Sequence, residues 1–187
     1  PASLQRGGFA WEILAVLAPV INMILVAVFP LAMAYAAISD LLTMTIPNKV
    51  AIALVVAFLA LAPATGMGWQ AFIMHAAAGV LVLVIAFGLF AAGWIGGGDA
   101  KFCAAVALWI GWGTALVEYL VAASVFGGAL TLLVLSYRQA VLPAFVTRQP
   151  WLLRLHDAKA GVPYGVALAA AGIFTYPDSI WMKVVTG

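Results

Sequence analysis

The segment from Val50 to Gly98 contains no Lys, Arg, Asp or Glu residue. A helix needs about 20 apolar residues to cross the hydrocarbon core of a bilayer, so this segment is too long for one crossing and can supply two. The whole chain has the same character, since 67% of its 187 residues are hydrophobic and only 7% are charged. Such a composition lacks the polar surface of a soluble domain. We therefore predict an all-α polytopic membrane protein with no separate soluble domain.

Turn residues divide the apolar sequence into about six predicted transmembrane helices. The run 63–68, which contains Pro63 and two glycines, separates the second from the third, and Gly111 and Gly113 separate the fourth from the fifth. The first apolar run is much longer than the about 7–15 residues of a signal-peptide core, so we expect it to be a retained span. The predicted spans of this single membrane-embedded domain, 1–187, are 12–39, 50–63, 70–92, 100–112, 114–137 and 162–180.

Charge and cysteine content argue against several other functions. The net charge of +2, from 8 Lys and Arg and 6 Asp and Glu residues, is too small and too scattered to indicate a nucleic-acid partner. Cys103 is the only cysteine, so the chain can form neither an internal disulfide nor a site with paired zinc-binding thiolates. We expect Cys103 to be a small core residue, and we predict no cofactor and no metal.

Two acidic residues lie where a membrane protein should not easily accommodate them. Asp40 ends the first apolar segment and Asp99 follows the glycine run 96–98. A carboxylate at the edge of the hydrocarbon costs several kcal/mol unless it is paired or neutralised, so an acid at such a depth indicates a functional site. Two predicted crossings separate Asp40 from Asp99. Both acids are therefore expected at the same face of the membrane, as a shared site requires.

The basic residues indicate which face this is. Two fall on the opposite face, Arg6 and Lys183. Six are expected on the same side as the two acids: Lys49, Lys101, Arg138, Arg148, Arg154 and Lys159. Because cytoplasmic loops carry an excess of Lys and Arg, the acids are predicted to face the cytoplasm, with the N-terminus outside.

A close pair of carboxylates is suited to acid and base catalysis. Two such groups cannot both ionise cheaply, so one retains a proton while the other can take a proton from water. The glycines Gly96, Gly97 and Gly98 would allow an extended peptide to approach Asp99. If the fourth span begins at Asp99, this residue would be its N-cap and the helix dipole would favour its ionised form, whereas burial would oppose ionisation. The sequence leaves open which acid holds the proton.

Three further residues flank this predicted site. Pro47 and Asn48 are expected to start the second span and to shape the site structurally. Lys101 could hold the site electrostatically, bind a lipid phosphate or extend to the membrane surface. The polar connector 138–161 could contact anionic lipid or the substrate, and its Trp151 region is predicted to lie on the membrane.

Three sequence blocks carry a family resemblance. They are Ser39-Asp40-Leu41 with Ile46-Pro47-Asn48, then Gly96-Gly97-Gly98-Asp99-Ala100-Lys101-Phe102, and then Arg154-Leu155-His156-Asp157 with Val162-Pro163-Tyr164-Gly165-Val166-Ala167. In this order, and with these spacings, the blocks resemble the type IV prepilin peptidases, the bacterial GxGD aspartic proteases. The last block is similar to the small members of the family that serve Flp pili.

The resemblance implies a membrane aspartic endopeptidase with Asp40 and Asp99 as its catalytic pair. Its substrate would be a prepilin with a basic leader and a hydrophobic N-terminal helix, cleaved at the cytoplasmic face of the bacterial inner membrane. Larger relatives also methylate the new N-terminus. The short segment 41–49 and the single cysteine favour a peptidase without that second activity. Unlike small relatives, which often carry basic residues there, residues 41–45 have none, so leader docking at that point is not predicted.

Two other classes of function remain compatible with paired acids in a membrane. A proton-coupled small carrier would bind and release protons at the acids. A non-catalytic pilus-assembly subunit would pair them with basic segments of a partner. We regard both as alternatives to the peptidase.

Overall fold

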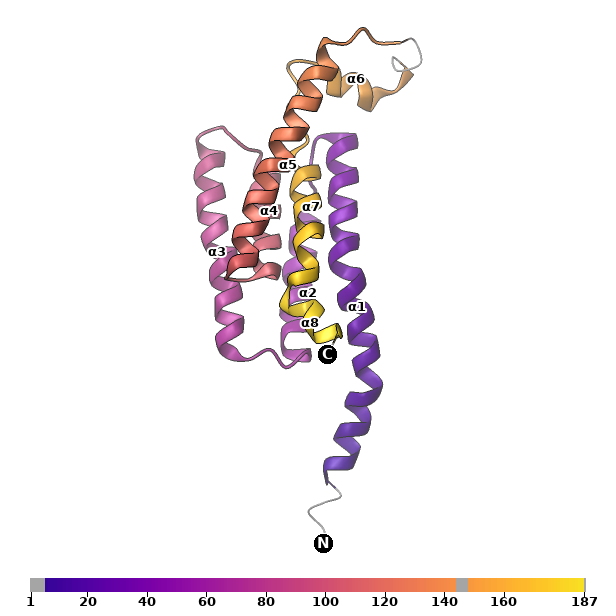
Figure 1. Ribbon diagram of the computed structural model, residues 1–187, viewed down its shortest axis with the longest axis vertical. Helices are drawn as coiled ribbons and strands as arrows, with labels where there is room; N and C mark the ends of the chain where they lie inside the picture. Colours follow the sequence, from indigo (N-terminus) through magenta and orange to yellow (C-terminus); the bar gives the residue numbers. More distant parts are fainter. Residues whose placement is uncertain (1–5, 144–147, 187) are drawn as a thin grey trace.

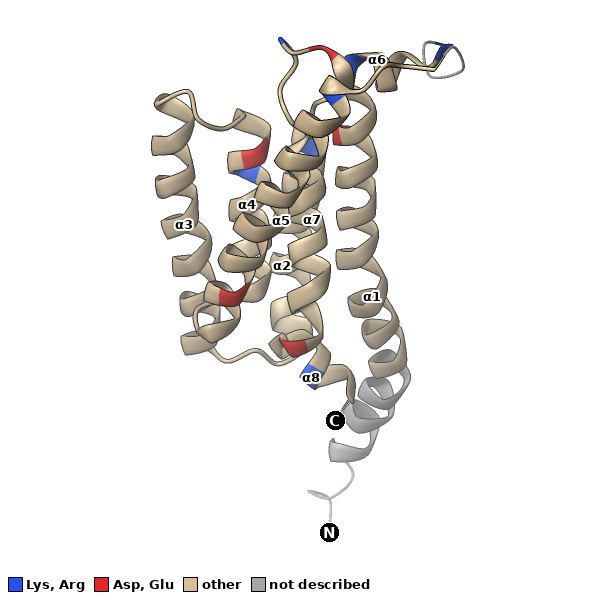
Figure 2. Cartoon of the chain, turned by 45° about the horizontal axis from the view of Figure 1, so that its top comes forward, with Lys and Arg blue, Asp and Glu red and all other residues tan. Residues whose placement is uncertain are grey.

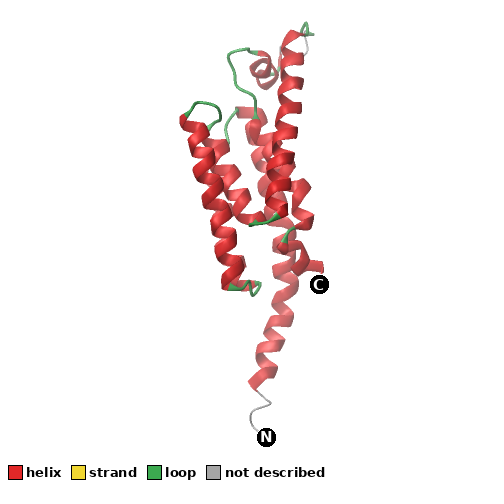
Figure 3. Ribbon diagram, turned by 60° about the vertical axis from the view of Figure 1, so that its left-hand side comes forward, coloured by secondary structure: helices red, strands yellow, loops and turns green. Residues whose placement is uncertain are grey.

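The computed structural model describes the backbone of residues 6–143 and 148–186, and the side chains of this part from residue 18 on. Within it the chain is entirely helical, and Figure 3 shows helices and loops without strands. Its helices, labelled in Figure 1, are α1 (Arg6–Thr43), α2 (Asn48–Ala64), α3 (Trp69–Ala91), α4 (Gly97–Ile110), α5 (Thr114–Gln139), α6 (Pro150–His156), α7 (Tyr164–Thr175), the 3₁₀ turn η2 (Tyr176–Asp178) and α8 (Ile180–Thr186).

The apolar helices support a membrane protein. In the described part of the chain, three helical segments are both long and apolar enough to cross a bilayer: Ala18–Thr43 of α1, the whole of α3 and the whole of α5. Helix α2 is equally apolar but has only 17 residues. The expected number of about six crossings therefore stays a prediction.

The segment 162–180, expected to be one span, is divided into α7, η2 and α8. Helix α7 has 12 residues and is therefore only about 18 Å long at 1.5 Å per residue, well short of the hydrocarbon thickness. Pro177 lies in the η2 turn, and the chain then turns so that Trp181 is fully buried. The Trp181 Nε1–H donates a 2.7 Å hydrogen bond to the Trp109 carbonyl oxygen. This contact holds α8 against the end of α4.

The two short helices α4 and α7 form the centre of the bundle. Helices α2 and α3 pack mainly on α4, and α1 and α5 pack mainly on α7. Small residues on the central helices allow this close approach. On α4 these include Ala104, Ala105 and Ala107, and on α7 they include Ala167, Ala171 and Gly172. By contrast, α3 makes almost no contact with either α2 or α5, so the bundle is open on both sides of α3.

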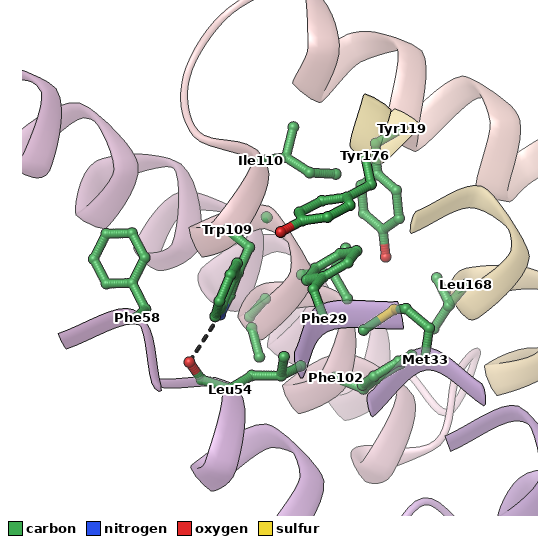
Figure 4. Close-up of a cluster of buried hydrophobic side chains, with 14 of the residues drawn as sticks. Phe29, Met33, Leu54, Phe58, Phe102, Trp109, Ile110, Tyr119, Leu168 and Tyr176 are labelled. Carbon is green, nitrogen blue, oxygen red and sulfur yellow. Dashed lines mark hydrogen bonds between the residues drawn. The ribbon is translucent and has the colours of Figure 1, made fainter. Parts of the chain in front are cut away.

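Aromatic side chains cluster in the core around Trp109, among them Phe29, Phe58 and Tyr176 (Figure 4). The Trp109 Nε1–H donates a 2.8 Å hydrogen bond to the Leu54 carbonyl oxygen, which joins α4 to α2. Phe29 stacks on Tyr176 with ring centroids 4.4 Å apart, and the Tyr176 hydroxyl donates a 2.7 Å hydrogen bond to the Leu25 carbonyl oxygen. These buried polar groups are therefore satisfied while they tie α1 to the η2 turn.

One end of the bundle gathers the helix ends that matter for the predicted site. Helix α1 ends there, α2, α4 and α7 begin there, and α6 lies just beyond (Figure 1). We call it the α6 end. Most of the Lys and Arg residues drawn in Figure 2 also lie toward this end, whereas Lys183 of α8 lies at the opposite one.

Candidate active site

Asp40 lies in the last turn of α1, and its side chain is only 4% exposed. The backbone N–H of Gly165, at the start of α7, donates a 2.7 Å hydrogen bond to Asp40 Oδ2. It is the only hydrogen bond that the described residues donate to this carboxylate. The contact fixes the side-chain orientation of Asp40 from a helix 125 positions away in the sequence.

A tight turn after Asp40 brings the chain back over it. The Met44 N–H donates to the Asp40 carbonyl oxygen at 2.7 Å, and Met44 has a φ of 56°, which only a few per cent of non-glycine residues adopt. The Ser39 hydroxyl donates to the Thr45 carbonyl oxygen at 3.0 Å and holds the turn closed. As a result, the next residue, Ile46, is buried against the site.

Asp99 is the third residue of α4, because this helix begins at Gly97 with Gly96 as its N-cap residue. The sequence suggested that Asp99 would be the N-cap residue if the helix began there. The helix begins two residues earlier, so Asp99 is not the N-cap residue. Its half-buried carboxylate turns back onto the Gly96 backbone, where a Cβ atom would lie 2.8 Å from Oδ2. The Gly96 N–H interacts with this carboxylate in the manner of a capping box. Because residue 96 is a glycine and has no Cβ atom, the Asp99 side chain can occupy this space.

Ile46 joins the surroundings of the two acids. A Cβ atom on Gly98 would lie 3.3 Å from the Ile46 carbonyl oxygen, and a Cβ atom on Gly165 would lie 2.5 Å from Ile46 Cδ1. Ile46 therefore contacts the residue before Asp99 on one side and the residue that binds Asp40 on the other. Acids from α1 and α4 thus share Ile46 as a neighbour at the α6 end.

A cavity of about 250 Å³ opens beside Asp99. Helices α3 and α5 form its sides, and α4 and α7 contribute the rest of its wall. Its lining is apolar except for a few groups, among them Asp99, Ser124 and Tyr164. The Tyr164 hydroxyl accepts a 3.2 Å hydrogen bond from Thr131, and its ring packs directly on Gly127 of α5. The cavity can hold an apolar side chain next to a carboxylate.

The other residues predicted near the site have separate surroundings. Gly97 packs against the Phe90 ring, where a Cβ atom would lie 3.2 Å from Cε2. Pro47 is the N-cap residue of α2, and Asn48 is the first residue of that helix. The Lys101 ammonium donates a 3.1 Å hydrogen bond to Asn48 Oδ1. Since residues two apart in a helix face opposite sides, Lys101 and Asn48 line a different surface from Asp99.

Sequence reasoning did not assign Gly165, Ile46 or Arg154 to the site. All three lie in the sequence blocks that carry the family resemblance, but nothing in their chemistry indicated which residues they would contact. The structure places Gly165 on the Asp40 carboxylate. Arg154 of α6 donates a 2.7 Å hydrogen bond to the Leu42 carbonyl oxygen and so fastens the connector to the end of α1.

The described residues include no group of three or more His, Cys, Asp or Glu side chains placed to hold a metal ion. The fold and the site are those of a helical membrane protein with two carboxylates at one end of its bundle. A sequence model of the type IV leader peptidase family matches residues 27–132, and this chain belongs to that family. The match includes Asp40, Asp99 and the whole of α2, α3 and α4. No curated protein and no solved structure matches the chain. Membership implies a membrane peptidase that acts on prepilins.

Proposed function

We propose that this protein is an aspartic endopeptidase that removes the leader peptide of type IV prepilins, with Asp40 and Asp99 as its catalytic pair. The observation that supports this most is the convergence of the two acids. They come from α1 and α4, lie at one end of the bundle and share Ile46 as a neighbour. Family membership supplies the substrate class.

In the proposed reaction one carboxylate takes a proton from water as the water oxygen attacks the scissile carbonyl carbon. The other acid, still protonated, donates a hydrogen bond to the carbonyl oxygen and so stabilises its developing charge. When the C–N bond breaks, a proton is delivered to the leaving nitrogen. The products are a leader with a new carboxyl terminus and a pilin with a free amine. No cofactor takes part in this sequence.

The cavity beside Asp99 supports a route for the substrate. A prepilin contains a hydrophobic helix that lies in the membrane, so it should reach the site from the bilayer. The side of the bundle between α3 and α5 is open there, because these helices hardly touch. An apolar side chain next to the scissile bond would occupy the cavity while its peptide group lies against Asp99. The space beside Gly96, Gly97 and Gly98 is taken up by Asp99, Phe90 and Ile46, so these glycines serve the packing of the site and not, as the sequence suggested, the approach of a peptide.

We further propose that the α6 end faces the cytoplasm of a bacterium, in the inner membrane, with about six crossings and the N-terminus outside. The excess of Lys and Arg toward this end supports the orientation. The similarity of blocks 154–157 and 162–167 to those of small relatives supports a prepilin of the Flp type. The short connection between α1 and α2, residues 44–47, supports a peptidase without N-methyltransferase activity.

The experiment is co-expression with a candidate Flp prepilin, following the mass of the pilin. Asp40→Asn and Asp99→Asn should each abolish leader removal while the protein stays folded in the membrane. Glu118→Gln, which changes an exposed acid on α5 remote from the site, should process the pilin normally. Normal cleavage by either Asn variant would exclude an aspartic mechanism at this pair. If both Asn variants cleave but no longer join pilus components, an assembly subunit is favoured, and proton flux in liposomes without cleavage would favour a carrier.

A further inference from the structure

A second, larger opening lies on the other side of α4 from Asp99. It is a groove of about 640 Å³ between α2 and α3, with α4 as its floor. Helices α2 and α3 follow each other in sequence, yet they hardly touch, so the groove separates them along most of their length. Its floor is formed by Ala104, Ala105 and Leu108 of α4. A gap of this kind within a membrane must be filled, because apolar surfaces that lack contacts lose dispersion energy.

The groove is apolar along its length and polar at one end only. Its polar lining residues are Asn48 and Lys101, both exposed at the α6 end. The hydrogen bond from Lys101 Nζ to Asn48 Oδ1 holds the ammonium over this end of the groove. The described residues form no ion pair with Lys101, and the nearest acid in sequence, Asp99, lines the cavity on the opposite side of α4. A cation above an apolar channel is complementary to an amphipathic anion.

The chemistry of the groove indicates its occupant, because one cation stands at the end of an otherwise apolar surface. An extended acyl chain is thin and fits lengthwise between α2 and α3. With the acyl chain in the groove, the lipid headgroup would lie next to the Lys101 ammonium.

We propose that this groove is a binding site for an anionic phospholipid, with one acyl chain between α2 and α3 and the phosphate at Lys101 and Asn48. The bound lipid completes the packing of α3, which has its main protein contact with α4 alone. This proposal does not depend on the catalytic roles of the two acids. It makes one face of α4 a lipid site and leaves the other face to the peptidase reaction.

The test measures lipid binding to the purified, delipidated full chain by native mass spectrometry. Phosphatidylglycerol and phosphatidylcholine with identical acyl chains are compared. The wild type should bind the first phosphatidylglycerol about fivefold more tightly, the factor expected for a single lysine at about 1 kcal/mol. Lys101→Gln should abolish this preference. Lys49→Gln is the matched control, because Lys49 lies at the same end but sits over the Tyr35 ring, 5.1 Å from its centroid.

A second pair of variants tests the apolar part of the site. Ala76→Trp on α3 fills the groove and should weaken the binding of both lipids, whereas Ala77→Trp, one residue along and exposed outside the groove, should not. Equal losses in Lys49→Gln and Lys101→Gln, equal losses in the two Trp variants, or no preference for phosphatidylglycerol would each overturn the proposal. Displacement of the lipid by a peptide with a prepilin's apolar helix would assign the groove to the substrate. A dimer that Ala76→Trp dissociates would assign it to a second copy of the chain.

Discussion

The Gly165 N–H donates a 2.7 Å hydrogen bond to Asp40 Oδ2, and this contact joins the start of α7 to the end of α1. A Cβ atom at position 165 would lie 2.8 Å from that same oxygen and 2.5 Å from Ile46 Cδ1. No side chain larger than a hydrogen atom therefore fits between Asp40 and α7. The position of one proposed catalytic acid depends on a residue that carries no side-chain chemistry.

The first prediction follows from this contact. Gly165→Ala should push Asp40 and Ile46 away from their positions and lower the rate of leader removal about 100-fold, as a displacement of about 1 Å can. The rate is measured with purified protein and prepilin in detergent. Gly161→Ala is the control, since nothing lies within 4 Å of a Cβ atom there. Equal rates for the two variants would show that the Gly165 contact does not position Asp40.

A second prediction concerns the cavity beside Asp99. Ser124→Trp places an indole in this space of about 250 Å³ and should lower kcat/KM for prepilin cleavage about tenfold or more, because the substrate side chain loses its pocket. Ala129→Trp adds the same group to an exposed position of α5 that does not line the cavity, and should leave kcat/KM unchanged. If the Ser124 variant cleaves normally, the substrate does not use this cavity.

The third prediction concerns the buried hydrogen bond between α4 and α2. Trp109→Phe removes the indole N–H and its hydrogen bond to the Leu54 carbonyl oxygen, which keeps its backbone partner within α2, so the loss should cost about 1 kcal/mol of unfolding free energy. Trp94→Phe makes the same chemical change at a residue that is 77% exposed and should have little effect. Unfolding in mixed micelles by added denaturing detergent, followed by circular dichroism, measures the difference. Equal stability of the two variants would mean that the indole hydrogen bond contributes nothing.

Arg138 provides the fourth prediction, since its guanidinium fastens the connector to α5. It donates hydrogen bonds to the carbonyl oxygens of Leu155, Ala160 and Gly161, at 2.9, 2.7 and 2.9 Å. Hydrogen bonds from a charged donor are about twice as strong as neutral ones, so Arg138→Gln should release the segment that leads into α7. Amide hydrogen exchange in residues 157–162 should then become faster. In Lys159→Gln, which removes an exposed charge of the same segment, exchange should stay as in the wild type.

Part of this organisation could be predicted from local sequence. The glycine and proline turns predicted the ends of α2, α3 and α5 to within two residues, because apolar runs and turn residues are local signals. The segment 162–180 was expected to be one helix and is not. Its break depends on the burial of Trp181 against the Trp109 carbonyl oxygen, and that partner lies 72 positions away. Hydropathy alone cannot detect such a contact.

The sequence by itself determined the class of the protein and the two acids worth attention, since composition, uncharged length and motif spacing are properties of the chain. Only the tertiary structure decided what surrounds Asp40 and Asp99. Gly165, Ile46 and the cavity beside Asp99 come from segments far apart in sequence, and their contacts depend on how α1, α4 and α7 pack. The structure likewise separated Lys101 from Asp99, because two residues two positions apart on one helix face opposite sides. Packing is a property of the assembled helices, so it could not be predicted from any one of them.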